Sequence, residues 1–218
     1  MKLIYNITQR CIWIVTFVIS RFLMGLSIKG SHNLKLLPTP LLIISNHRSY
    51  WDSMIIGTFL PFFSGKYIPV GFMAADKFHQ NFFYKFFFIL TGTFPTYKGK
   101  GLNISLKYPR SVLGKKGAFL IFPFGKIIQG DQHPFPGRGA AKLVQDFPDL
   151  TILPIYLYTA FNFKFKGLFF NKRNMRAVIG QSFIISKSQT ISLDHISKIL
   201  SEKILSLNDV ADINIKKL

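Results

Sequence analysis

The chain has 218 residues, enough for one domain with a sizeable core, and its 28 Lys and Arg against 9 acidic residues give a formal net charge of +19. A single cysteine excludes a disulfide framework or a cysteine-built zinc site within one chain. Because 49% of the residues are hydrophobic and 24 are Phe, the excess charge favours an anionic membrane surface as partner over nucleic acid, for which no recognised binding module is present.

The N-terminal segment is apolar but interrupted. Residues 4–28 are mostly apolar except for Arg21, whereas a spanning helix needs roughly 20 apolar residues. No small-x-small cleavage site follows the apolar core. We therefore interpret residues 4–28 as a retained helix that lies in or dips into one leaflet, and residues 1–29 as the membrane-associated N-terminal segment that contains it. A buried helix and a single tilted span are the alternatives.

Short apolar runs alternate with helical patterns along the rest of the chain. The alternation predicts an α/β fold, a single domain over residues 30–218 in which helices cover a central mixed sheet. The aromatic residues 81–90 form a second candidate for membrane contact. In chain order we predict strand 41–45, helix 53–60, strands 70–74 and 93–97, helix 102–113, strand 118–122, helix 140–147, strands 151–158 and 175–179, and helix 194–207.

A polar segment, Asn46-His47-Arg48-Ser49-Tyr50-Trp51-Asp52, separates the first of these strands from the first helix. Open α/β sheets bind their ligands at the carboxyl ends of strands, where this segment would lie. His47 can act as a general base near neutral pH. Asp52, at the start of the helix, can hold the other ring nitrogen and so fix the tautomer. As an alternative, Ser49 and Asp52 also fit a helix-capping pattern, and His47 could be an ordinary loop histidine.

The pattern Asn46-His47-x-Ser49-x-x-Asp52 resembles the first conserved block of the glycerophospholipid acyltransferases, the family of 1-acylglycerol-3-phosphate O-acyltransferase. Further segments resemble the later blocks in the family's order, so that the resemblance extends over roughly residues 30–185. These segments are Gly92-Thr93-Phe94-Pro95-Thr96-Tyr97-Lys98, Phe122-Pro123-Phe124-Gly125, residues 134–143 and Ile152-Leu153-Pro154-Ile155.

The resemblance implies an O-acyltransferase with an acyl-CoA or acyl carrier protein donor and a lysophospholipid acceptor such as 1-acylglycerol-3-phosphate. His47 would deprotonate the acceptor hydroxyl and Asp52 would orient His47. Asn46 and Ser49 would help to bind substrate. No metal or cofactor is expected. The single cysteine, Cys11, fits a reducing compartment, so we expect the enzyme at the cytoplasmic face of the inner membrane.

The third block departs from the family pattern. Phe124 stands where the family usually has glutamate and Ile127 where it has arginine, and the resemblance implies that those polar residues bind the glycerol phosphate. Lys98, Lys126 and Arg138 are our candidates to supply the missing positive charge. The departures leave two alternatives open. In the first, the acceptor is different, for example a lyso-ornithine lipid or another lipid amine or hydroxyl. In the second, the chain is a catalytically inactive lipid-binding relative.

Overall fold

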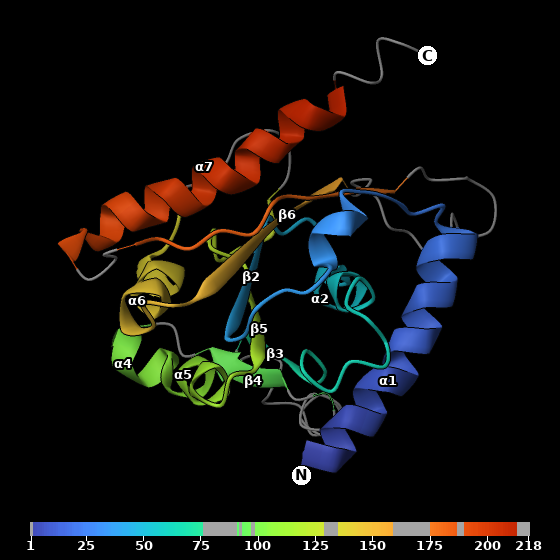
Figure 1. Ribbon diagram of the computed structural model, residues 1–218, viewed down its shortest axis with the longest axis horizontal. Helices are drawn as coiled ribbons and strands as arrows, with labels where there is room; N and C mark the ends of the chain where they lie inside the picture. The colour runs from blue at the N-terminus through green and yellow to red at the C-terminus, as the bar shows by residue number, and fades with distance from the viewer. Residues whose placement is uncertain are drawn as a thin grey trace.

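The computed structural model describes residues 2–75, 91, 93–96, 99–128, 135–158, 175–186 and 190–212. Within these residues a seven-stranded sheet forms the centre of the fold (Figure 1). All neighbouring strands are parallel except β6 and β7. The predicted α/β fold with a mixed sheet is therefore confirmed. The strand order is β1 (Ser27–Lys29), β7 (Arg176–Ile179), β6 (Thr151–Tyr158), β2 (Leu41–Ser45), β5 (Ala118–Ile121), β3 (Val70–Ala75) and β4 (Thr93–Thr96).

Strand β2 shows why the central strands are continuous apolar runs. Its side chains alternate, so that Leu41 and Ile43 belong to the core on one face of the sheet and Leu42 and Ile44 to the core on the other. Both faces are covered, which is the condition under which a strand has no polar side. In Figure 1, α7 and α6 lie on one side of the strands, and α1 lies at the opposite side next to α2.

After the N-terminal segment, the helices match the predicted segments with one exception. The helix predicted over residues 102–113 is divided into α4 (Gly101–Ser105) and α5 (Lys107–Gly114). Pro109 has no N–H to donate to the carbonyl of Ser105, so one continuous helix would lose a hydrogen bond and meet the proline ring there. The other helices after the N-terminal segment are α2 (Asp52–Gly57), α6 (Arg138–Asp146) and α7 (Leu193–Asp212).

The N-terminal segment is only partly helical. Helix α1 (Lys2–Val18) continues into a π-helical turn, η1 (Ile19–Leu23), but residues 27–29 form strand β1 on the sheet edge and Ser31–Leu34 form a short 3-10 helix, η2. The prediction of a helix up to residue 28 is therefore wrong at its end. Among the described residues, no helix is both long and apolar enough to cross a membrane.

Helix α1 is fixed to the domain by polar side chains. Gln9 donates from Nε2 to the carbonyl oxygens of Val70 (2.8 Å) and Thr91 (2.7 Å), and its Oε1 accepts the Val70 N–H (2.8 Å). Arg10 donates to the carbonyl of Phe62, and the indole N–H of Trp13 donates to the carbonyl of Leu60 (3.2 Å). These contacts join α1 to the start of β3, to Thr91 and to the segment between α2 and β3.

Candidate active site

The polar segment 46–51 leaves the carboxyl end of β2, the middle strand of the sheet, as predicted. Strands β5 and β6 flank β2 and run parallel to it. The loop that follows β5 therefore leaves the sheet on the same side as this segment. Parallel strands thus bring together two loops that lie about 75 residues apart in the chain.

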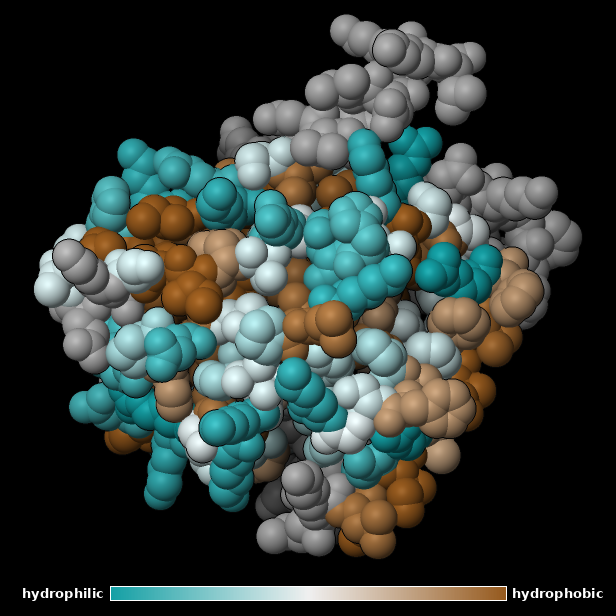
Figure 2. All heavy atoms as spheres, in the orientation of Figure 1, coloured by the Kyte–Doolittle hydropathy of each residue, from teal (hydrophilic) through white to brown (hydrophobic). Residues whose placement is uncertain are grey.

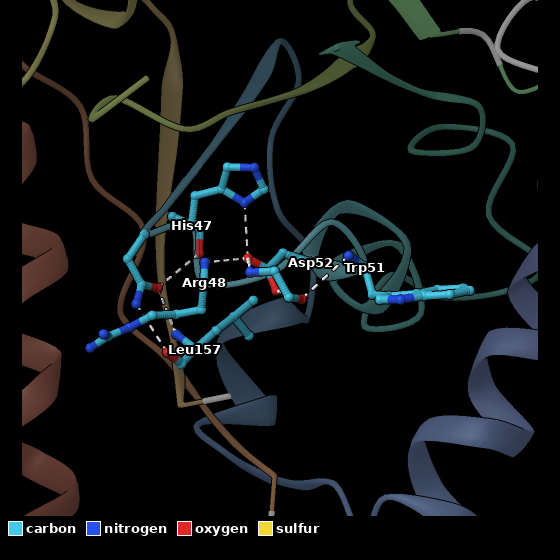
Figure 3. A network of polar contacts seen from close by, with 8 residues as sticks. His47, Arg48, Trp51, Asp52 and Leu157 are labelled. Carbon is cyan, nitrogen blue, oxygen red and sulfur yellow. Dashed lines mark hydrogen bonds and ion pairs between the residues drawn. The ribbon is translucent and has the colours of Figure 1, made fainter. Parts of the chain in front are cut away.

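His47 and Asp52 form a direct pair. The Nδ1 atom of His47 lies 2.9 Å from Oδ2 of Asp52, the first residue of α2 (Figure 3). Because an ionised carboxylate only accepts hydrogen bonds, this contact places the ring proton on Nδ1 and leaves Nε2 as an acceptor. The Asp52 side chain is 0% exposed, whereas that of His47 is 19% exposed. The buried group thus orients a group that substrate can reach.

Three further donors hold the Asp52 carboxylate. The backbone N–H groups of Arg48 (2.5 Å) and Ser49 (2.8 Å) donate to Oδ2, and the Ser49 hydroxyl donates to Oδ1 (2.6 Å). The Ser49 hydroxyl also accepts the N–H of Trp51 (3.3 Å). These donors compensate for the burial of a negative charge. Among the described residues, no side chain caps α2 at its N-terminal residue Trp51, so the carboxylate holds the preceding segment and His47 and does not cap the helix.

Asn46 is completely buried and engages the neighbouring strand. Its Nδ2 donates to the carbonyl of Leu157 in β6 (3.0 Å), and its Oδ1 accepts the N–H of the same residue (2.8 Å). With one donated and one accepted hydrogen bond, the side chain extends the ladder between β2 and β6. These bonds fix the backbone just before His47. These contacts indicate a positioning role, and the predicted role of Asn46 and Ser49 in substrate binding stays a prediction.

The loop after β5 contacts His47 twice. The ring of Phe122 stacks on the imidazole with centroids 4.1 Å apart and planes inclined by 12°. The N–H of Ile128 donates to the carbonyl of His47 (2.7 Å). Between these contacts the chain turns at residues 122–125, where the N–H of Gly125 donates to the carbonyl of Phe122 (3.0 Å). The third-block loop therefore holds both the ring and the backbone of His47.

The two departures from the family pattern lie in this loop. Phe124 is buried in the core between the sheet and the helices α5, α6 and α7. An apolar side chain suits that position, and a carboxylate there would be costly. Ile127 is half-buried and Lys126 is exposed. In sequence, Lys126 lies between Phe122 and Ile128, the two residues of the loop that contact His47.

Arg138 has a partner on α7. Its guanidinium forms a two-point ion pair with Asp194, from Nε to Oδ1 (2.7 Å) and from Nη2 to Oδ2 (2.8 Å). The hydrogen bond from Arg138 lowers the pKa of the Asp194 carboxyl, and the same pair raises the pKa of Arg138. The guanidinium thus joins the starts of α6 and α7, and its role in binding phosphate stays a prediction. Lys98 lies outside the described residues.

Two features of the site were not predicted from the sequence. One is the stacking of Phe122 on His47. The other is Arg48, whose Nη2 donates to the hydroxyl of the buried Tyr156 in β6 (3.0 Å). Phe122 is the last residue of the strand predicted over residues 118–122, and the first contact follows only from the pairing of that strand with β2, which the sequence does not show. No local pattern relates Arg48 to a tyrosine 108 residues further along.

The comparisons with known proteins agree with this geometry and define the class of protein. The Acyltransferase family model matches residues 27–158, which is more than half of the chain, and the chain belongs to this family. Among solved structures, the chain is similar to a 1-acyl-sn-glycerophosphate (LPA) acyltransferase, PlsC, from Thermotoga maritima, with a TM-score of 0.61. The match covers 97% of this chain and 98% of that one at 11% sequence identity, a likeness of fold. No curated protein matches the chain in sequence.

Proposed function

We propose that this acyltransferase moves a fatty acyl chain from acyl-CoA or acyl carrier protein to the hydroxyl of a lysophospholipid such as 1-acylglycerol-3-phosphate. The observation that carries the proposal is the pair of His47 and Asp52, with the imidazole accessible and the carboxylate buried and held by three further donors. The likeness of fold to PlsC, described as an LPA acyltransferase, supports this acceptor class.

The proposed reaction needs no nucleophile from the protein. Nε2 of His47 takes the proton of the acceptor hydroxyl as its oxygen attacks the thioester carbonyl. The C–O bond forms, the tetrahedral intermediate collapses, and the C–S bond breaks. The imidazolium then gives its proton to the departing thiolate. Asp52 stabilises the imidazolium between the two proton transfers and keeps Nε2 directed at the substrate, because Nδ1 is bound to its carboxylate.

An apolar pocket beside α2 is a candidate site for an acyl chain. It lies between α1, α2 and β3, is partly open to solvent and has a mostly apolar lining. Ser53 and Met54, the two residues after Asp52, belong to its wall. A mostly apolar lining is typical of sites for apolar ligands. The other lining residues are Gln9, Ile12, Trp13, Gly57, Ile68, Val70, Phe72 and Thr91.

The orientation of α1 supports association with a membrane. Residues that recur every three or four positions face solvent and are mostly apolar, whereas Gln9 and Arg10 contact the domain. A helix of a soluble domain has the opposite arrangement. Figure 2 shows apolar residues gathered along the side of the molecule where α1 lies. The exposed apolar residues of this face, here called the α1 stripe, are Leu3, Ile4, Ile7, Ile14, Val15, Val18 and Phe22.

The α1 stripe would lie in the interface of one leaflet, which requires no spanning helix. The net charge of +19 favours an anionic surface, to which each nearby Lys or Arg adds about 1 kcal/mol of attraction. We place this surface at the cytoplasmic face of the inner membrane, where both lipid substrates and acyl donors would be within reach of His47.

The acceptor head group is the finer part of the proposal. Lys126 is the candidate phosphate ligand best placed for it, because its loop is fixed to His47. The buried Phe124 favours one alternative, an acceptor other than 1-acylglycerol-3-phosphate, such as a lyso-ornithine lipid. In that case the amine or hydroxyl of the acceptor would still be deprotonated by His47.

An acceptor panel tests the proposal. Purified protein in detergent would be given acyl-CoA or acyl carrier protein donors with separate lysolipids, and products would be identified by mass spectrometry. We expect a diacyl product from lysophosphatidate and weaker transfer to it by Lys126→Ala. A product formed only from a lyso-ornithine lipid would establish the alternative acceptor. No thioester turnover with any pair, by protein shown to be folded, would contradict the enzyme proposal and favour an inactive lipid-binding relative.

A further inference from the structure

The two most exposed of the large hydrophobic side chains that the structure describes lie outside α1. Leu36 is 94% exposed and Phe63 is 89% exposed. Leu36 follows η2, and Phe63 lies between α2 and β3. Scattered exposed hydrophobic residues are normal on protein surfaces. These two differ because their loops are joined to each other and to the helix that carries the α1 stripe.

The carbonyl oxygen of Leu37 joins the two loops. It accepts hydrogen bonds from the phenol of Tyr67 (2.7 Å) and from Nζ of Lys66 (2.9 Å). Burial raises the pKa of Tyr67, which keeps the phenol protonated and able to donate. The loops that carry Leu36 and Phe63 are therefore joined through Leu37, Lys66 and Tyr67. We call these two joined loops, residues 35–37 and 62–67, the platform.

The backbone of Leu36 adds a second unusual feature. Its φ is +54°, in the left-handed region that a leucine adopts only at a cost of about 1 kcal/mol. The residue thus combines unfavourable backbone geometry with nearly full exposure of an apolar side chain. Strained residues that persist in a fold are candidates for function.

The platform adjoins the α1 stripe through Arg10. On the helix surface Arg10 lies three residues after Ile7 and four before Ile14, so it borders both of these exposed residues. Its guanidinium donates to the carbonyl of Phe62 and lies 5.2 Å from the centre of the Phe62 ring. The ring of Phe62 packs edge-on against Phe63 with centroids 5.0 Å apart. The Phe62 ring also packs against Trp13 of α1 with centroids 5.0 Å apart, so aromatic contacts join α1 to the Phe63 loop.

Positive charges flank both apolar tips. Lys35 directly precedes Leu36 and is exposed, and Lys66 lies three residues after Phe63 and is also exposed. Apolar side chains flanked by lysines suit the boundary between acyl chains and anionic head groups, where each part meets a matching environment. A protein partner could also match these charges, but it would not explain why the platform is linked to the α1 stripe. The link therefore favours a bilayer over a protein as the partner.

We propose that Leu36 and Phe63, with Lys35 and Lys66, form a second contact with an anionic lipid bilayer beside α1. This inference rests on the proposed membrane association and makes it specific. Two contacts fix the tilt of the domain on the surface, which one helix lying flat does not. The angle at which the His47 site faces the leaflet is then set by the platform.

Vesicle binding by full-length variants tests the proposal. The double variant Leu36→Asn with Phe63→Ser removes both tips, and asparagine tolerates the left-handed backbone at residue 36. The matched control, Ile104→Asn with Phe135→Ser, removes similar apolar groups from exposed positions on α4 and before α6. Sedimentation with vesicles of phosphatidylglycerol and phosphatidylcholine would measure the partition coefficient. Turnover of detergent-dispersed substrates would be measured in parallel.

We expect the partition coefficient of the tip variant to fall by about tenfold or more, since two large apolar side chains would leave the bilayer. The control variant should bind as the native protein does, and both should keep native turnover in detergent. Equal binding by the tip variant and the native protein, or equal losses in the two variants, would overturn the proposal. If the native protein and both variants all lacked turnover in detergent, the catalytic proposal would be contradicted, and the comparison of vesicle binding would still be valid.

Discussion

Two roles were predicted for Asp52 from the sequence: a structural role at the start of the helix and the orientation of His47. Oδ2 of its carboxylate accepts the backbone N–H groups of Arg48 and Ser49, in the segment that precedes α2, and also holds Nδ1 of His47. The other oxygen, Oδ1, accepts the Ser49 hydroxyl, so all of these contacts are made by one carboxylate at the same time. A local pattern that fits a cap is therefore no argument against a catalytic pair.

Two substitutions separate the two contributions of this carboxylate. Asp52→Asn keeps an acceptor for Nδ1 but removes the charge that stabilises the imidazolium, so we expect turnover to fall on the order of 10³-fold. Ser49→Ala removes one hydrogen bond to the carboxylate and should cost roughly 1–3 kcal/mol of stability with most of the turnover retained. Steady-state rates and urea unfolding would measure both. Equal losses of turnover in Asp52→Asn and Ser49→Ala would indicate that Asp52 acts only by holding the segment before α2.

Phe122 is expected to position His47 by covering one face of its ring. A stacked aromatic pair contributes about 0.5–1.5 kcal/mol beyond its buried area, so Phe122→Leu should lower kcat by about threefold to tenfold and leave KM nearly unchanged. Phe122→Tyr keeps the stack and should restore most of the rate. Phe147→Leu, which thins the core elsewhere, is the control. A change confined to KM in Phe122→Leu would contradict the positioning role.

Among the elements, the central strands could be predicted from the sequence and the edge strand β1 could not. Strands β2 and β6 are long apolar runs because both faces are covered, and such runs are visible without partners. Strand β1 has one apolar residue among three, and it exists because β7 pairs with it from far along the chain. The contacts between Asn46 and Leu157 could not be predicted either, because these residues are also far apart in the sequence. His47 and Asp52 are close in the sequence, so their pairing could be predicted.

The attachment of α1 to the sheet depends on one amide. Gln9 satisfies the N–H and carbonyl of Val70 and the carbonyl of Thr91, so Gln9→Ala leaves these backbone groups without that partner. We expect a loss of about 1–3 kcal/mol in the free energy of unfolding. Hydrogen exchange at β3 should accelerate in parallel. Gln181→Ala, at an exposed position, is the control, and equal effects of the two substitutions would contradict this account of the attachment.

For the whole molecule, charge and apolar surface act together in membrane binding. The net charge of +19 attracts an anionic surface over a distance that salt shortens, whereas burial of the α1 stripe depends little on salt. Binding to phosphatidylglycerol vesicles should therefore weaken as salt rises from about 0.05 to 0.5 M, without disappearing. Co-sedimentation would measure it. Complete release at high salt would show that the α1 stripe does not enter the bilayer.

The fold and the family relationship make this chain an acyltransferase of α/β architecture, and the proposal adds the residues that carry the reaction. Those residues lie at the carboxyl end of the middle strand, next to an apolar pocket and close to a basic loop. Each part has a chemical purpose in the proposed transfer of an acyl chain from a thioester donor.

The most direct test is the rate of acyl transfer by His47→Ala, measured from a thioester donor to the best acceptor of the panel, in protein shown by circular dichroism to be folded. We expect a loss on the order of 10²-fold or more, because the acceptor hydroxyl would lose its base. A rate equal to that of the native protein would contradict the proposed role of His47 and, with it, the assignment of this site.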